Sequence, residues 1–155
     1  MSERKEQITA ALRAAREELQ AVIGGLKDAD WQRPTPCEGW TIRDVVAHLS
    51  VGEPGNILIA RRILNDEEGV VAGFDLNRYN MRQVEKRRDK STSELMNDLA
   101  TARAETLALL SALSEGQLDK RGRRTTGEET TVEQVFYQIA RHDQMHGEHV
   151  RRALD

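Results

Sequence analysis

The chain has 155 residues, of which 38% are hydrophobic and 32% charged, as is typical of one globular domain over residues 1–155. Its net charge of −3 lacks the basic excess of a nucleic-acid or anionic-membrane surface, so we expect neither as a partner. We expect no signal peptide, and no membrane span, because no stretch approaches roughly 20 apolar residues. The single cysteine, Cys37, excludes an intrachain disulfide and suits a cytoplasmic protein.

The spacing of apolar residues predicts helices in the first half of the chain. Residues 2–24 carry apolar side chains at three- and four-residue steps, and a double glycine ends the pattern. A loop follows at 30–40, where two prolines forbid a helix and two tryptophans are expected to pin the segment to the body. Thr41 and Asp44 form a capping box for a second helix up to residue 64, which the Gly-Glu-Pro-Gly segment 52–55 should break or kink.

The second half of the chain continues this pattern. A weaker, charged helix is expected at 74–88. Capping boxes at Ser91/Glu94 and Thr130/Glu133 open two further long helices, and the polar segment 120–130 between them is either a loop or a short hairpin. Because no run alternates as a strand does, we expect an all-α fold: a four-helix bundle with short additional helices.

All four histidines lie in two of these helices. His142, His146 and His149 have the spacing i, i+4, i+7, which places them on one helix face, and they continue the inward apolar stripe of the last helix. His48 lies beside the inward stripe of the second helix. A lone inward histidine is usually a hydrogen-bonded core residue. Histidines at three successive inward-facing positions would, without a cation, compete for few hydrogen-bond partners. The pattern therefore predicts a metal site.

The expected ligands are His48, His142 and His146, because two ligands from one helix rarely suffice and His48 is the natural third. Three protein ligands leave an open position, which is typical of catalytic sites. His149 is either a fourth ligand or a hydrogen-bond partner of the molecule that the metal binds. Imidazole suits several divalent metals, of which Zn and Ni are our first expectations. Nearby Asp143 and Glu148 are expected to be solvated carboxylates.

Residues 34–48, Pro-Thr-Pro-Cys-Glu-Gly-Trp-Thr-Ile-Arg-Asp-Val-Val-Ala-His, resemble the N-terminal metal-binding domain of mycothiol-dependent maleylpyruvate isomerases. Together with His142-x-x-x-His146 they resemble the wider DinB-like superfamily. The resemblance implies a four-helix bundle whose metal is held by His48, His142 and His146, and it places His149 where relatives often have Gln or Asn. Those isomerases carry a second domain after the bundle, and some have an acid at the position of His142.

The resemblance also implies a function, because several DinB-like proteins are thiol S-transferases. We expect a metal-dependent transferase that joins a low-molecular-weight thiol, such as mycothiol or bacillithiol, to an electrophile. Arg43, Arg141 or the arginines between 121 and 124 are candidates for binding an acidic thiol or substrate. Cys37 is expected to pack in its loop and not to act as a nucleophile.

Three alternatives stay open at this point. The protein could be a metal-dependent isomerase or hydrolase that uses a metal-bound water. It could be a non-catalytic metal-binding or stress-response protein whose site is structural or vestigial, which a closed four-histidine site would favour. It could also be an interaction module whose histidines serve a homodimer interface.

Overall fold

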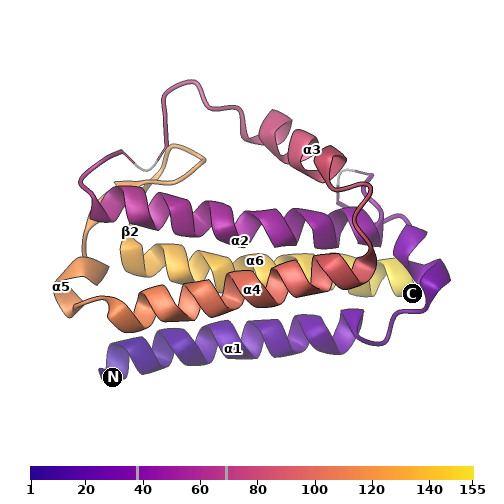
Figure 1. Cartoon of the computed structure of the whole chain (residues 1–155), viewed down its shortest axis with the longest axis horizontal. Helices are drawn as coiled ribbons and strands as arrows, with labels where there is room; N and C mark the ends of the chain where they lie inside the picture. Colours follow the sequence, from indigo (N-terminus) through magenta and orange to yellow (C-terminus); the bar gives the residue numbers. More distant parts are fainter. Residues whose placement is uncertain (38, 69) are drawn as a thin grey trace.

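Four long helices lie side by side in the computed structural model, which describes residues 1–37, 39–68 and 70–155 (Figure 1). The expected all-α bundle with short extra pieces is confirmed. The elements in chain order are α1 (Glu3–Ile23), a 3-10 helix (Asp28–Gln32), α2 (Ile42–Leu64), α3 (Leu76–Lys86), α4 (Thr92–Ala112), α5 (Glu115–Leu118), β1 (Arg121–Arg123), β2 (Glu129–Thr131) and α6 (Val132–Leu154). None of the helices in these ranges is both long and apolar enough to cross a membrane.

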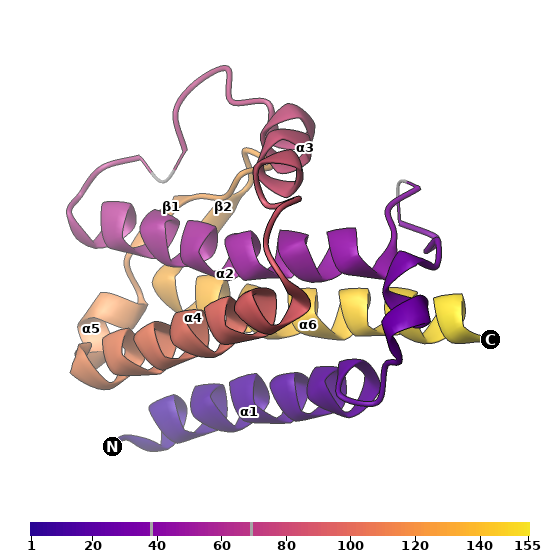
Figure 2. The same ribbon diagram turned by 45° about the vertical axis from the view of Figure 1, so that its right-hand side comes forward.

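The helices of the bundle do not simply alternate in direction. Contacts join α1 to α6, α6 to α2, α2 to α4 and α4 to α1. The helices α1 and α6 run in one direction, whereas α2 and α4 run in the other (Figures 1 and 2). Because the neighbours α2 and α4 are parallel, the chain between them must return along the bundle. This crossover carries α3, which packs against α2.

The interior consists of two hydrophobic clusters separated by charge. One cluster joins the first half of α1 to the second half of α2, and the other joins the end of α1 to the start of α2. Between them Glu53 accepts hydrogen bonds from Arg16 at 2.6 Å, Arg103 at 2.8 Å and Thr106 at 2.7 Å. Asp143 accepts one bond of 2.9 Å from each arginine. We call these five buried residues the ion-pair network.

Helix α2 contains Pro54 but continues from Ile42 to Leu64, so of the expected break or kink the break is wrong. An interior proline costs about 3 kcal/mol. Both halves of α2 bury apolar side chains in the two clusters, and a break would misplace one of those faces. Burial therefore outweighs the local effect of the proline.

The capping boxes of α2 and α4 are confirmed, but the last helix begins one residue later than expected. Thr131 and Gln134 form its capping box in place of Thr130 and Glu133. Thr130 is buried in β2, which pairs with β1, so the segment 120–130 forms the hairpin and not the open loop. At Gly122 an added Cβ would lie 2.4 Å from Ile63, so the missing side chain lets the hairpin rest against the end of α2.

Candidate metal centre

Three of the four predicted site residues meet between α2 and α6. His48 Nε2 lies 3.0 Å from His142 Nε2, and His146 Nε2 lies 3.1 Å from the same atom. His48 comes from the second turn of α2, and the other two come from consecutive turns of α6. The neighbouring antiparallel helices therefore bring together residues that are almost a hundred positions apart in the sequence.

These nitrogens cannot fully satisfy one another. An imidazole nitrogen offers either one N–H or one lone pair, so His142 Nε2 cannot make a full hydrogen bond to both His48 and His146. A cation that accepts one lone pair from each ring removes this conflict. With metal–nitrogen distances of about 2.0–2.1 Å, neighbouring ligand nitrogens lie about 3.0 Å apart in octahedral and about 3.4 Å apart in tetrahedral geometry. The observed distances suit such a donor set.

Burial keeps these imidazoles neutral. Desolvation, with a smaller effect of His142, lowers the pKa of His48 from 6.5 to about 3. The pKa of His146 falls to about 2, mainly through desolvation and then through its histidine neighbours. Desolvation also lowers the pKa of His142, although Asp143 and Glu53 oppose this shift. At neutral pH all three rings therefore keep the lone pairs that a metal requires.

Two neighbours shape the cluster, and the sequence did not mark either as a site residue. An added Cβ at Gly52 would lie 2.8 Å from Cε1 of His142, so the missing side chain makes room for that ring against α2. Trp40 lies with its ring centroid 4.9 Å from that of His48. We expected Trp40 only to anchor its loop to the body of the protein, and its contact with His48 was not predicted. The sequence did contain a signal for this contact. Trp40 directly precedes Thr41, the N-cap of α2, and His48 lies in the second turn of the same helix.

His149 lies behind the cluster and not within it. Its Nδ1 is 3.2 Å from His146 Nδ1, which is the ring nitrogen on the side away from the Nε2 contact. Cys37 also lies close, with its sulfur within 4.8 Å of ring nitrogens of His146 and His149. The cysteine packs against the hydrophobic cluster at this end of the bundle, as expected for a loop residue. The sequence did not predict its proximity to these two histidines.

The expectation that Asp143 is solvated is wrong, because only 3% of this residue is exposed. Its carboxylate belongs to the ion-pair network. The buried face of α6 is consequently centred on Asp143 and His146, whereas His142 and His149 are half-buried at its edge. Glu148, in contrast, lies near the surface and pairs with Arg151 and Arg152.

The arginines proposed for an acidic ligand have different surroundings. The guanidinium of Arg43 donates to the carbonyls of Arg87, Arg88 and Lys90 at the end of α3, so it holds that helix in place. Arg141 is exposed beside Gln138. Arg124 lines a large cavity next to the histidines.

This cavity has a volume of about 800 Å³, within the range of small-molecule sites. Its walls come from α2, α3, α6, the residues before α3 and the tip of the hairpin. His48, His142 and His146 line it, as do Cys37 and Trp40. The histidine cluster therefore faces a space that admits a ligand.

Several solved structures have the same fold, and the description of one of them names a metal. A mycothiol-dependent maleylpyruvate isomerase has a TM-score of 0.81 and 14% identity, with 94% of this chain covering 60% of that one. YfiT from Bacillus subtilis, described as a probable metal-dependent hydrolase with an unusual four-helix bundle topology, has a TM-score of 0.80 and 20% identity, with coverages of 99% and 87%. The colibactin self-resistance protein ClbS, solved in complex with a dsDNA, has a TM-score of 0.77 and 13% identity, with coverages of 96% and 94%.

At identities this low, the similarity to these structures shows a shared fold and nothing more. The chain spans only 60% of the length of the isomerase. Comparison with curated protein sequences finds no match. The family described as the mycothiol maleylpyruvate isomerase N-terminal domain matches residues 12–147, a range that includes His48, His142 and His146. The chain therefore belongs to the mycothiol maleylpyruvate isomerase N-terminal domain family.

Proposed function

We propose that the protein is a metal-dependent thiol S-transferase. His48, His142 and His146 would hold one divalent metal, Zn or Ni, and a low-molecular-weight thiol would react there with an electrophile. The observation that carries the proposal is the convergence of three neutral ring nitrogens within a cavity of about 800 Å³. Membership of a family described by a mycothiol-dependent enzyme supports the thiol as the second reactant.

A bound divalent metal would supply the positive charge that converts a coordinated thiol to its nucleophilic thiolate. The three imidazoles are uncharged, so they leave this charge uncompensated. In the reaction the thiolate sulfur would form a bond to the electrophilic carbon while the bond between that carbon and its leaving group breaks. The leaving group would depart with the electron pair and take up the proton lost by the thiol, directly or through water. Trp40 and the apolar cavity wall would limit the access of competing water.

We assign His149 a positioning role. When Nε2 of His146 acts as the ligand atom, its Nδ1 carries the proton and can donate to Nδ1 of His149 at 3.2 Å. This contact would fix the tautomer and the orientation of the His146 ring. A small molecule remains our proposed substrate, because the DNA in the ClbS structure belongs to that protein and this chain has a net charge of −3.

The test combines metal analysis with a thiol panel. Protein purified without a chelator or a histidine tag should contain one divalent metal per chain. After cobalt substitution, mycothiol, bacillithiol or glutathione should add an intense near-ultraviolet sulfur-to-cobalt band and should support turnover with a model electrophile. His48→Ala should abolish both signals, whereas the matched surface variant Arg13→Gln, at an exposed position of α1, should change neither. If none of the thiols changes the cobalt spectrum at millimolar concentration and none supports turnover, the transferase proposal is wrong.

A metal-dependent hydrolase is the second candidate, and the description of YfiT as a probable enzyme of that class favours it. The same histidines would then activate a water molecule. The two candidates differ in one measurement. A hydrolase turns over an ester or amide panel without thiol, and a thiol that occupies the metal inhibits it, whereas a transferase requires the thiol.

A further inference from the structure

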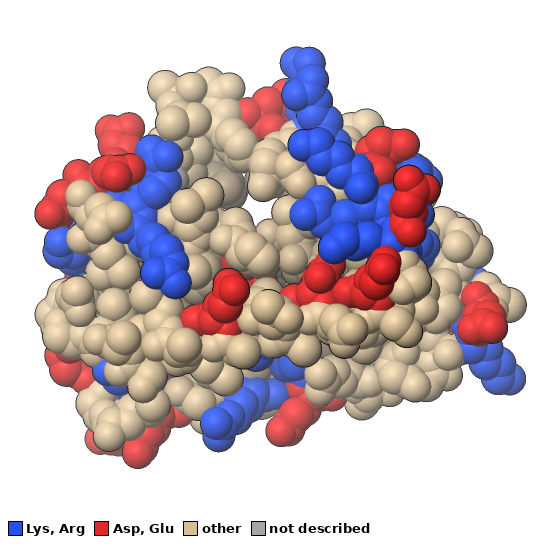
Figure 3. All heavy atoms as spheres, viewed as in Figure 1, with Lys and Arg blue, Asp and Glu red and all other residues tan. Residues whose placement is uncertain are grey.

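The cavity beside the histidines gathers most of the exposed large apolar side chains of the described residues. These exposed side chains are Met1, Leu58, Val71, Met81 and Met145, and all except Met1 line the cavity. Single exposed apolar residues are common, but a group around one hollow usually marks a binding site. Figure 3 shows this hollow between the crossover and the body of the bundle, bordered mainly by uncharged side chains. An apolar part of a ligand is the natural occupant.

The charged groups of the cavity are all of one sign. Among the described residues that line it, the only charged ones are Arg62 and Arg124, and there is no Asp, Glu or Lys. This is unexpected for a chain with 26 acidic residues and a net charge of −3. Positive charge in a lining where none of the described residues is a carboxylate favours an anionic group in the ligand.

The arginines lie at the end of the cavity opposite the histidines. His48, Gly52, Gly55, Ile59 and Arg62 follow one another at four- and three-residue steps, so they form a row along one face of α2. The 14 positions from His48 to Arg62 correspond to about 21 Å along the helix axis. A short-chain acid cannot contact both ends of such a row.

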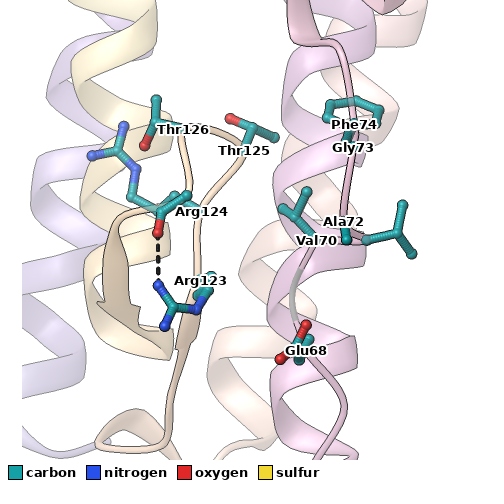
Figure 4. A pocket seen from close by; sticks show the side chains of 11 residues that line it. Glu68, Val70, Ala72, Gly73, Phe74, Arg123, Arg124, Thr125 and Thr126 are labelled. Atoms are coloured by element: carbon teal, nitrogen blue, oxygen red, sulfur yellow. Dashed lines mark hydrogen bonds between the residues drawn. The ribbon is translucent and has the colours of Figure 1, made fainter.

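The hairpin supplies the second arginine. The contact between Gly122 and Ile63 places the hairpin beside the last turn of α2, which carries Arg62. A smaller cavity of about 370 Å³ continues from there between the hairpin tip and the residues before α3 (Figure 4). Val70, Phe74 and Arg124 are among the residues that line both cavities, so the two spaces adjoin.

Neither guanidinium group has a close, buried carboxylate partner among the described residues. Arg62 donates from Nε to the carbonyl of Glu68 and lies 3.8 Å from the exposed carboxylate of Glu67. Arg124 donates to the exposed carboxylate of Glu128 at 3.4 Å. Such pairs contribute little. Each guanidinium carries five N–H donors, so donors remain for a carboxylate in the cavity.

We propose that the electrophilic substrate is an elongated, largely apolar carboxylate. Its acid group would be bound by Arg62 and Arg124, its hydrocarbon part would lie along the row on α2, and its reactive carbon would lie at the histidine end. The assignment of a reactive carbon rests on the proposed transferase function, whereas the binding mode rests on the cavity alone.

The experiment measures binding of octanoate, octanol and octylamine to the metal-loaded protein by calorimetry. Octanoate should bind at least ten-fold more tightly than octanol or octylamine, and affinity should rise about four-fold for each methylene from hexanoate to octanoate. The double variant Arg62→Gln/Arg124→Gln should lose at least ten-fold in octanoate affinity and less than two-fold in octanol affinity. The variant Arg13→Gln, which changes an exposed arginine of α1 outside the cavity, should bind octanoate like the wild type.

His48→Ala separates this proposal from direct binding of the carboxylate to the metal. Octanoate affinity should survive in this variant; if it is lost there and kept in the arginine double variant, the acid group binds at the histidines and the proposal is wrong. Equal affinities of octanol and octanoate for the wild-type protein would overturn it as well, whether or not the double variant folds. None of these outcomes depends on thiol turnover, so failure of the transferase function is recognised separately.

Discussion

The ion-pair network and the histidine cluster lie next to each other in the bundle, but they satisfy their polar groups in opposite ways. In the network, two guanidiniums and a hydroxyl donate to two carboxylates, and the described residues leave no buried side-chain nitrogen or oxygen without a partner. In the cluster, three equivalent nitrogens meet and one of them must serve two neighbours. The first arrangement is complete without a ligand, whereas the second is suited to a cation.

The ion-pair network and the histidine cluster use neighbouring positions on the same two helices. Gly52 precedes Glu53 on α2, and His142 precedes Asp143 on α6. On each helix one residue faces the cavity and the next faces the core. Removing one partner of a buried ion pair destabilises a fold far more than the intact pair stabilises it. The network therefore fixes the relative positions of the helices that carry the histidines, and this comparison can be tested group by group.

The largest effect is expected from His146→Ala. This change removes one converging nitrogen, and the loss in metal affinity should exceed the roughly 10- to 100-fold typical of losing an outer partner. Bound metal after dialysis, measured by plasma mass spectrometry, should fall to a small fraction of the wild-type value. Full metal occupancy in this variant would contradict the assignment of His146 as a ligand.

Glu53→Gln should affect folding more than any surface charge. The change leaves two buried arginines with only Asp143 as an anionic partner, and we expect the free energy of unfolding to fall by about 3–5 kcal/mol. Urea denaturation measures this loss. The control Asp98→Asn removes the negative charge that pairs with Lys90 at a partly exposed position and should cost less than about 1 kcal/mol. Similar losses in both variants would mean that the network does not hold the bundle together.

Acid should destabilise the metal-free protein, which we expect to unfold cooperatively because its hydrophobic clusters form without the histidines. The folded pKa values of His48 and His146, about 3 and about 2, lie below the unfolded value of 6.5. Below pH 6.5 the unfolded state therefore binds more protons, so stability falls as the pH falls. Between pH 7 and pH 6 we expect a loss of about 1–2 kcal/mol. His48→Gln should flatten this dependence, and a slope unchanged by that substitution would exclude His48 as its source.

The smallest effect is expected from His149→Gln. An amide can accept the hydrogen bond from Nδ1 of His146, so metal affinity should fall by less than about ten-fold and part of the activity should remain. His149→Leu cannot accept this bond and should lose more, up to about 100-fold. Metal titration of both variants checks the order. Complete loss of metal in the glutamine variant would instead identify His149 as a fourth ligand.

The sequence predicted the parts of the molecule that depend on local patterns. The helices, the capping boxes at Thr41 and Ser91 and the shared face of His142 and His146 all follow from spacing along one helix at a time. The approach of His48 from α2 was expected because two ligands from one helix rarely suffice and because of the family resemblance. The error at the start of α6 was one residue, since the hairpin pairing that buries Thr130 is not visible in the cap pattern.

Features that depend on several helices were missed. Asp143 looks like a surface carboxylate until Arg16 from α1 and Arg103 from α4 are placed beside it. The proximity of Cys37 to His149 likewise depends on how a loop and the far end of α6 meet. Such contacts are set by the packing angles and order of the helices, which periodicity alone does not determine.

The direction of the helices has a consequence for how this fold can diverge. A bundle with alternating directions would join α2 to the next helix by a short turn, whereas here the returning segment forms one wall of the cavity. It contributes Val71, Phe74 and Met81 to that wall, yet Val84 is the one buried residue of α3. Substitutions in this wall can therefore change which molecules enter while the bundle interior stays intact. Ligand selectivity and folding stability are thus encoded in largely separate parts of the chain.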